Sequence, residues 1–130
     1  MRIAIPKWDG RMSPAFDFAS SLLLVDIKDG SEMDRCEETL SPESAARRAA
    51  RLKDLEVDVL ICGAISRILA QSVTRGGIDI LAYVTGPVEN VLTAYMAGQL
   101  TKPEFVLPGC WPGARRGFRR HRARWRHNRY

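Results

Sequence analysis

Histidine is absent from the first 108 residues of the 130-residue chain, and both histidines come after that point. This absence excludes Ser-His-Asp and Cys-His catalysis, and histidine-ligated zinc, from most of the sequence. Acidic residues are absent from the remaining part: residues 109–130 hold eight arginines and no acid, whereas residues 1–108 hold 12 Lys and Arg against 15 Asp and Glu. The formal charge of +5 is therefore the sum of an acidic segment and a strongly basic one.

Long hydrophobic runs and paired cysteines are missing as well. No stretch approaches the roughly 18–20 apolar residues of a membrane-spanning helix, and the first residues form a strand-like run rather than a cleavable signal. Cys36, Cys62 and Cys110 are far apart and odd in number, which is unlike a disulfide framework. We therefore expect a cytoplasmic protein that does not contact a membrane.

Apolar patterning predicts one α/β domain over residues 1–108. The predicted strands span residues 2–6, 22–27, 33–39, 57–62 and 78–84. The predicted helices start at Ser41, Ser66 and Gly86, and the last one runs to about Leu100. This order predicts a mixed five-stranded sheet with helices on both faces, in which residues 33–39 form an exposed edge strand.

Apolar spacing within the helices predicts which side chains face the core. The first helix places Ala45, Ala49, Leu52 and Leu55 on one face and its basic residues, Arg48 among them, elsewhere. The second helix places Ile68, Leu69 and Val73 inward and stops at Gly76-Gly77. Cys62, on a central strand, is predicted to be a small core residue.

The turn from Cys62 to Ser66 follows a central strand and opens a helix. Backbone N–H groups and a helix N-terminus at such a position favour an anionic ligand, so Gly63 and Ala64 are candidate ligand-binding residues. The alternative is that Gly63 only makes a tight turn. The segment matches neither G-x-x-x-x-G-K-[ST] nor G-x-G-x-x-G, which leaves nucleotide binding without support.

The predicted strand order is that of ribonuclease H-like folds, which raises the question of a nuclease. Two-metal phosphoryl transfer needs converging carboxylates, including one on the first strand. Residues 2–6 contain no acid, and we interpret Asp9 and Asp17 in the following loop as solvated turn residues. A metal-dependent nuclease is therefore not expected.

Residues 109–130 form a basic tail with too few aliphatic residues for a core, and we expect it to be mobile without a ligand. Its aromatic residues Trp111, Phe118 and Trp125 recur every seven positions among the arginines. Arginine with interleaved aromatics is typical of segments that bind RNA or single-stranded DNA. Guanidinium groups bind small polyanions equally well, so both kinds of ligand stay open.

Cys110, His121 and His127 form a Cys/His constellation with the spacing C-x₁₀-H-x₅-H. Thiolate and imidazole groups are suitable ligands for iron, zinc or copper, and we take these three residues as candidate metal ligands. Their spacing matches no closed zinc module and leaves a structural zinc one ligand short. The alternative is that both histidines are solvated members of an arginine run.

The segments described so far resemble the dinitrogenase iron–molybdenum cofactor biosynthesis family, which includes NifX-like proteins and the last domain of NifB-type proteins. The resemblance covers essentially the whole chain and implies a ribonuclease H-like α/β domain. It rests on MRIAIP at residues 1–6, SPAF at 13–16, VDVLICGAI at 57–65, AYMAGQL at 94–100, and FVLPGC at 105–110 followed by the Arg-rich end.

What the resemblance implies is a protein that binds or carries an iron–sulfur or iron–molybdenum-type cluster, or its precursor, without catalysing a reaction. Such clusters are anionic and need soft or imidazole ligands in positive surroundings. Cys110, His121 and His127 would supply the ligands, and the tail arginines Arg115, Arg116, Arg119 and Arg120 would pair with anionic groups. The expected partners are proteins of metallocluster biosynthesis or cluster acceptors; the rival interpretation is nucleic-acid binding through the tail.

Overall fold

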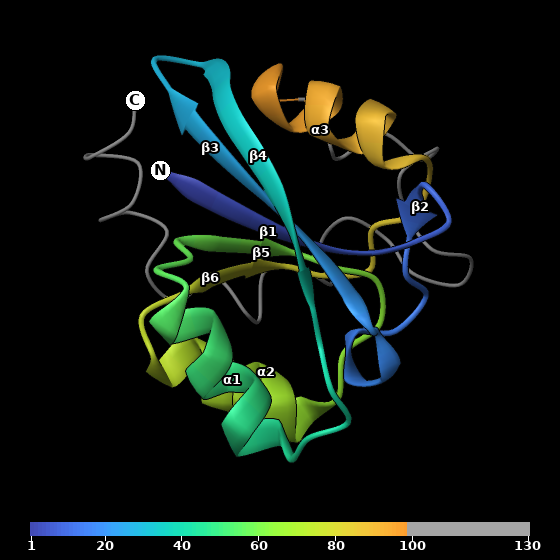
Figure 1. The fold of residues 1–130 in the computed structure, drawn as a ribbon, viewed down its shortest axis with the longest axis vertical. Helices are drawn as coiled ribbons and strands as arrows, with labels where there is room; N and C mark the ends of the chain where they lie inside the picture. Colours follow the sequence, from blue (N-terminus) through green and yellow to red (C-terminus); the bar gives the residue numbers. More distant parts are fainter. Residues whose placement is uncertain (99–130) are drawn as a thin grey trace.

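A central sheet organises residues 1–98, the part of the chain that the computed structural model describes (Figure 1). Its main strands are β1 (Arg2–Trp8), β3 (Ser21–Lys28), β4 (Ser31–Thr39), β5 (Val59–Ile61) and β6 (Asp79–Leu81), in the order β4-β3-β1-β5-β6. The β4–β3 and β3–β1 pairs are antiparallel, whereas β1, β5 and β6 are parallel. The predicted mixed sheet is confirmed, and a short strand, β2 (Arg11–Met12), also pairs with β1.

Two tight turns set the antiparallel half of the sheet. Asp9 and Gly10 join β1 to β2 with φ values of 53° and 79°, and Asp29 and Gly30 join β3 to β4 with φ values of 54° and 77°. Positive φ at both central residues matches the right-handed twist of the flanking strands, and Asp-Gly tolerates it well. The Asp-Gly pair at 29–30 makes the hairpin that its sequence predicts, whereas the pair at 9–10, expected to lie in a loop, makes a second hairpin.

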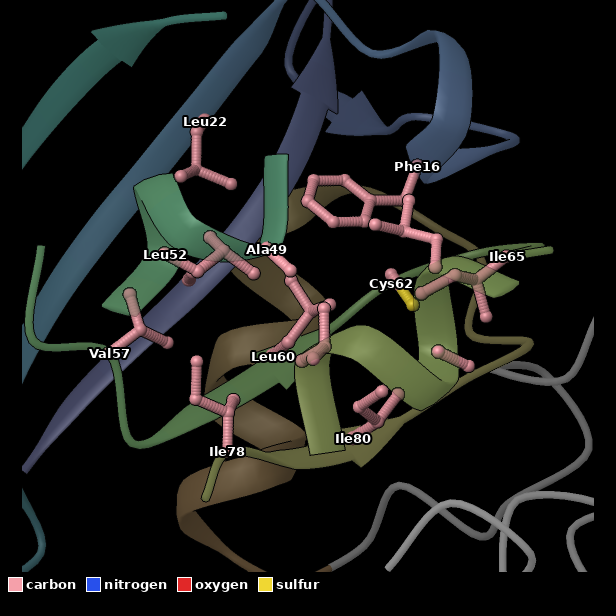
Figure 2. Packing of buried hydrophobic residues seen from close by; sticks show 14 of the residues in the cluster. Phe16, Leu22, Ala49, Leu52, Val57, Leu60, Cys62, Ile65, Ile78 and Ile80 are labelled. Atoms are coloured by element: carbon pink, nitrogen blue, oxygen red, sulfur yellow. The ribbon is translucent and has the colours of Figure 1, made fainter. Parts of the chain in front are cut away.

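Helices cover both faces of the sheet, as predicted. The helices α1 (Ala45–Asp54) and α2 (Arg67–Arg75) lie on one face, and α3 (Val88–Met96) lies on the other (Figure 1). The α1/α2 side buries a core that includes Phe16, Leu52 and Leu60 (Figure 2). A second core forms beneath α3. None of the helices within residues 1–98 is both long and apolar enough to cross a lipid bilayer.

Several predicted boundaries differ from the observed ones. Ser44, not Ser41, is the N-cap of α1, because its hydroxyl accepts the Arg47 N–H at 3.3 Å. The last helix ends at Met96 rather than near Leu100, since Gly98 adopts a left-handed conformation that stops it. β5 and β6 are shorter than predicted, although the Cys62 N–H still donates to Leu81 O beyond their ends.

Two predictions about helix faces are wrong. Ile68 is 69% exposed, because the buried stripe of α2 turns toward Ala70 and Thr74. Arg48 was placed off the apolar face of α1, yet it is only 3% exposed. Its guanidinium finds carbonyl acceptors inside the protein, which the spacing of apolar residues does not reveal.

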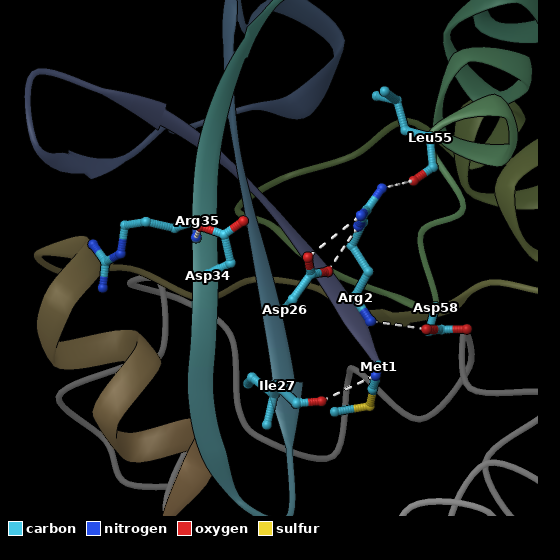
Figure 3. A network of polar contacts seen from close by, with 8 residues as sticks. All are labelled: Met1, Arg2, Asp26, Ile27, Asp34, Arg35, Leu55 and Asp58. Carbon is cyan, nitrogen blue, oxygen red and sulfur yellow. Dashed lines mark hydrogen bonds and ion pairs between the residues drawn. The ribbon is translucent and has the colours of Figure 1, made fainter.

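Arg2, at the start of β1, links the end of β3, the end of α1 and the start of β5 (Figure 3). Its guanidinium donates to Asp26 on β3, at 2.8 and 3.3 Å, and to the carbonyl of Leu55 after α1, at 2.7 Å. Its backbone N–H donates to Asp58 Oδ2 just before β5. The hydrogen bonds from Arg2 lower the pKa of the Asp26 carboxyl, although partial burial opposes this shift.

Replacing Asp26 with Asn is expected to lower stability at pH 7 by at most about 1 kcal/mol, because the pair is partly exposed. A carboxyl whose pKa is lowered by folding stabilises the protein above its unfolded-state pKa. That contribution is lost as pH falls through the folded-state value. Urea unfolding of both proteins should therefore show a difference at neutral pH that vanishes in acid; a difference independent of pH would contradict the assignment.

Candidate functional site

The carboxyl ends of the parallel strands β1, β5 and β6 lie at one edge of the sheet, where ligands of α/β proteins usually bind. Three loops meet there, at residues 9–20, 62–66 and 82–87. They are joined by backbone hydrogen bonds from Ala64 N to Pro14 O at 2.8 Å and from Tyr83 N to Gly63 O at 2.9 Å. We call this region the carboxyl edge.

Gly63 allows the first two loops to touch. A Cβ atom at this position would lie 2.5 Å from Pro14 O and 2.7 Å from Ser13 O, closer than such atoms approach in proteins. The loops are then fastened on both sides of Ala64, whose N–H donates to Pro14 O and whose carbonyl accepts the Phe16 N–H at 2.8 Å. Gly63 therefore does more than make a tight turn, because it permits a close backbone approach.

The N-terminus of α2 already faces a carboxylate. The Ser66 hydroxyl caps the helix by accepting the Leu69 N–H at 3.2 Å, and the Ser66 N–H donates to Asp17 Oδ1 at 2.8 Å. A carboxylate is favourable at this position because of the helix dipole. Gly63 and Ala64 remain predicted ligand-binding residues, but an anion at this helix end would have to compete with Asp17.

Replacing Asp17 with alanine is expected to lower the free energy of unfolding by about 1 kcal/mol, the usual value of a capping interaction. The physical reason is the loss of both a hydrogen-bond acceptor and a negative charge at the start of α2. Chemical denaturation measures the change. Asp17→Asn, which keeps one acceptor oxygen, should lose less; equal losses in both variants would mean that the charge alone matters.

Tyr83 holds the third loop in place. Its φ of +65° is in the left-handed region, which is unfavourable for a bulky side chain. The surrounding contacts compensate: its N–H bonds to Gly63 O, and its ring packs against the α1/α2 core. Strained residues of this kind are concentrated at functional sites, which supports the carboxyl edge as the candidate site.

Arg48, a buried residue of α1, anchors the loop at residues 9–20. Its guanidinium donates to Ala19 O at 2.8 Å, to Ser41 O at 3.1 Å and to Phe16 O at 3.3 Å. It also lies 5.5 Å from the centroid of the Phe16 ring, a cation–π geometry. A buried cation that satisfies three carbonyl groups thus ties α1 to this loop.

Within residues 1–98, the cysteines offer little to a metal. Cys62 is fully buried, and burial, with the negative charge of Asp17 as a smaller cause, raises the pKa of its thiol far above neutrality. This agrees with the prediction that Cys62 is a core residue. Cys36 is exposed on the edge strand β4. The described residues contain no group of three or more His, Cys, Asp or Glu that could hold a metal ion.

The predicted metal ligands and cluster-pairing arginines stay predictions, because they lie outside the described residues. The same is true of the proposed division between a domain ending at residue 108 and a basic tail. The predicted metal ligands are Cys110, His121 and His127, and the predicted cluster-pairing residues are Arg115, Arg116, Arg119 and Arg120.

Sequence reasoning missed the structural roles of Asp17, Arg48 and Tyr83. Asp17 was interpreted as a solvated turn residue, but its partner Ser66 is 49 positions away in the chain. Arg48 and Phe16 are separated by 32 positions. No local pattern marks such pairs, because only the folded topology brings the loops and helices together.

Comparison with known proteins decides between the families that share this architecture. A sequence model of the family described as dinitrogenase iron-molybdenum cofactor matches residues 1–98. The chain belongs to this family. The resemblance seen in the sequence is therefore confirmed over residues 1–98, and with it the α/β fold that it implies. No curated protein sequence matches the chain.

Solved structures show the same fold at low sequence identity. The apo form of the orange protein from Desulfovibrio gigas has a TM-score of 0.64 and 24% identity, over 75% of this chain and 88% of that one. A candidate dinitrogenase from Methanocaldococcus jannaschii has a TM-score of 0.62 and 18% identity, over 76% and 90% of the chains. A candidate NifB protein from Thermotoga has a TM-score of 0.59 and 22% identity, over 83% and 98%.

Proposed function

We propose that this member of the dinitrogenase iron-molybdenum cofactor family is a non-enzymatic carrier. Its cargo would be an anionic iron–sulfur or iron–molybdenum-type cluster, or a precursor of one. The observation that carries the proposal is the family match over residues 1–98. A carrier of this kind receives its cargo from one protein of metallocluster biosynthesis and delivers it to an acceptor.

The arrangement of the carboxyl edge supports a scaffold rather than a reacting site. Its charged and polar groups hold loops together: Asp17 binds Ser66, and Arg48 binds three backbone carbonyls. A carrier needs a stable platform that presents its ligands. It does not need a base or nucleophile poised for reaction.

The donor groups suited to a cluster come mainly from the end of the chain. Residues 1–98 contain no histidine, and their buried thiol, Cys62, stays protonated at neutral pH. Cys110, His121 and His127 supply one thiolate and two imidazoles, which suit iron and molybdenum–sulfur chemistry. The arginines Arg115, Arg116, Arg119 and Arg120 balance the negative charge of the cargo.

Anaerobic reconstitution of the full chain with iron and sulfide tests this assignment. Visible absorption and EPR should report a bound cluster in the parent protein. A triple variant, Cys110→Ser with His121→Ala and His127→Ala, should lose most of that signal. Cys36→Ser is the matched control, because it removes an exposed thiol on β4, outside the proposed ligand set, and should bind as the parent does.

The outcomes separate the carrier from its rival. Cluster binding that survives the triple variant would show that the ligands are wrongly assigned, and a parent chain that never binds a cluster would contradict the carrier function. Tight binding of RNA or single-stranded DNA that falls steeply with salt, without any cluster, would favour the nucleic-acid interpretation of the arginine-rich segment.

A further inference from the structure

Two aromatic side chains stand exposed at the carboxyl edge. Trp8, the last residue of β1, is 67% exposed, and Phe18, at the end of the short 3₁₀ turn Phe16–Phe18, is 88% exposed. Exposing large rings to water is unfavourable. Such rings, when they are gathered on one surface, usually mark a site of interaction.

Both rings line the same groove. It has a volume of about 320 Å³, and its apolar wall is formed by Trp8, Pro14, Ala15, Phe18 and Ala19. The exposed surface of this groove is mostly apolar, so it is suited to an inserted aliphatic or aromatic side chain.

The backbone that carries Phe18 is held in place before any partner arrives. On one side of Phe18, Asp17 Oδ1 accepts a hydrogen bond at 2.8 Å from the N–H of Ser66, the N-cap residue of α2. On the other side, the Ala19 carbonyl accepts a hydrogen bond from buried Arg48 at 2.8 Å. A loop whose backbone is already held loses less conformational entropy on binding than a free loop, which favours its use as an interface.

The charge beside the groove is positive on the Trp8 side. Arg11 lies directly opposite Trp8 in the β1–β2 pair, so the two side chains share one face of the ladder. Arg11 is exposed, and none of the acids in the described part of the chain forms an ion pair with it. Lys7, by contrast, also lines the groove but is paired with Glu37 at 2.7 Å.

We propose that this aromatic groove is the surface on which the protein docks a partner protein, through a segment that presents an apolar side chain next to a carboxylate. The apolar side chain enters between Trp8 and Phe18, and the carboxylate pairs with Arg11. The inference rests on the proposed carrier function, since a carrier must contact the proteins that load and unload it.

Other occupants fit the groove less well. An anionic cluster needs hydrogen-bond donors and metal ligands, whereas the walls are largely apolar. A nucleic-acid strand could stack on two rings. However, a strand brings a row of phosphates, and of the two basic residues described above Lys7 is already paired with Glu37, which leaves Arg11 to neutralise them.

A displayed peptide library, selected on the immobilised full-length protein, tests the docking surface. The selected sequences should combine an aromatic or aliphatic residue with Asp or Glu. Fluorescence anisotropy of the best synthetic peptide should show binding about tenfold weaker or more for Trp8→Ala and for Phe18→Ala. Arg11→Glu should also weaken it. Ile68→Ala removes another exposed apolar side chain outside the groove and should bind as the parent does.

The contrary results are equally specific. The proposal is overturned if no peptide is selected, if Trp8→Ala and Phe18→Ala leave binding unchanged, or if Ile68→Ala weakens it equally. A dimer of the parent chain that Trp8→Ala dissociates would assign the groove to a second copy instead. Loss of cluster uptake in Trp8→Ala and Phe18→Ala would assign it to the cargo, which overturns the docking surface but leaves the carrier function standing. Peptide binding by a parent chain that takes up no cluster would overturn the carrier function but leave the docking surface standing.

Discussion

Replacing Gly63 with alanine is expected to lower the free energy of unfolding by about 3 kcal/mol, at the upper end for overpacking of a core. The new methyl group would sit 2.5 Å from Pro14 O and 2.7 Å from Ser13 O. Neither contact can relax by a side-chain rotation, because both atoms belong to the backbone. Relief therefore requires the loop at residues 9–20 to separate from Ala64, which breaks the hydrogen bonds between them.

Urea unfolding monitored by circular dichroism measures the loss, with Gly76→Ala as the matched control. Gly76 follows α2 with an ordinary negative φ of −78°, and a Cβ there would come no closer than 3.4 Å to another atom. That variant should unfold close to the parent. If Gly63→Ala were as stable as Gly76→Ala, the close contact between the two loops would be wrong.

The second large effect concerns Arg48. Replacing it with methionine keeps most of the side-chain volume but removes the donors to Phe16 O, Ala19 O and Ser41 O. Phe16 O keeps the Ala19 N–H at 3.2 Å, but Ala19 O loses the Arg48 donor in the interior, and a buried carbonyl left unsatisfied is costly, so we expect a loss of about 2 kcal/mol. The loop at residues 9–20 should also exchange its amide protons faster, because its attachment to α1 is gone.

Arg47→Met is the control for that experiment, since Arg47 is the exposed neighbour on the same helix. Its removal should change stability little. Arg48→Lys should lie between the parent and Arg48→Met, because one ammonium group cannot replace the planar fork that reaches three acceptors. Equal stability of Arg48→Met and Arg47→Met would contradict the anchoring role.

The strand order was predictable because each local signal agreed with the global fold. The Asp-Gly pair at residues 29–30 predicted the β3–β4 hairpin, and Gly76-Gly77 marked the end of α2, where Gly76 is the C-cap and Gly77 has a φ of +87°. The charged edge strand was also predictable, since the β4 sequence is rich in acids and poor in apolar residues. In the structure β4 is exposed along almost its whole length. These features depend on neighbouring residues and therefore leave a trace in the sequence.

The carboxyl edge was predictable in position but not in detail. The turn at Gly63 and Ala64 was identified, whereas the carboxylate that occupies the neighbouring helix end was not. The burial of Arg48 was not predicted, because helical periodicity identifies a buried face by its apolar side chains. A buried guanidinium that is satisfied by carbonyls breaks that pattern. Long-range polar pairs of this kind are set by topology, so a single sequence does not encode them in any local form.

These contacts give the two parts of the chain different tasks in the proposed carrier. Residues 1–98 form a platform whose loops are held by Gly63, Asp17 and Arg48, and which presents the Trp8–Phe18 groove to a partner. The cluster ligands are proposed to come from Cys110, His121 and His127. In this proposal the arginines of residues 109–130 bind the cargo, and residues 1–98 contact the partner protein.

Metal analysis of the full-length protein, purified without oxygen and compared with the Cys110→Ser, His121→Ala, His127→Ala variant, tests this account most directly. The account predicts iron, with or without molybdenum, together with acid-labile sulfide in the parent protein and a large loss of both in the variant. Equal metal and sulfide contents in the two proteins, or none in either, would contradict it.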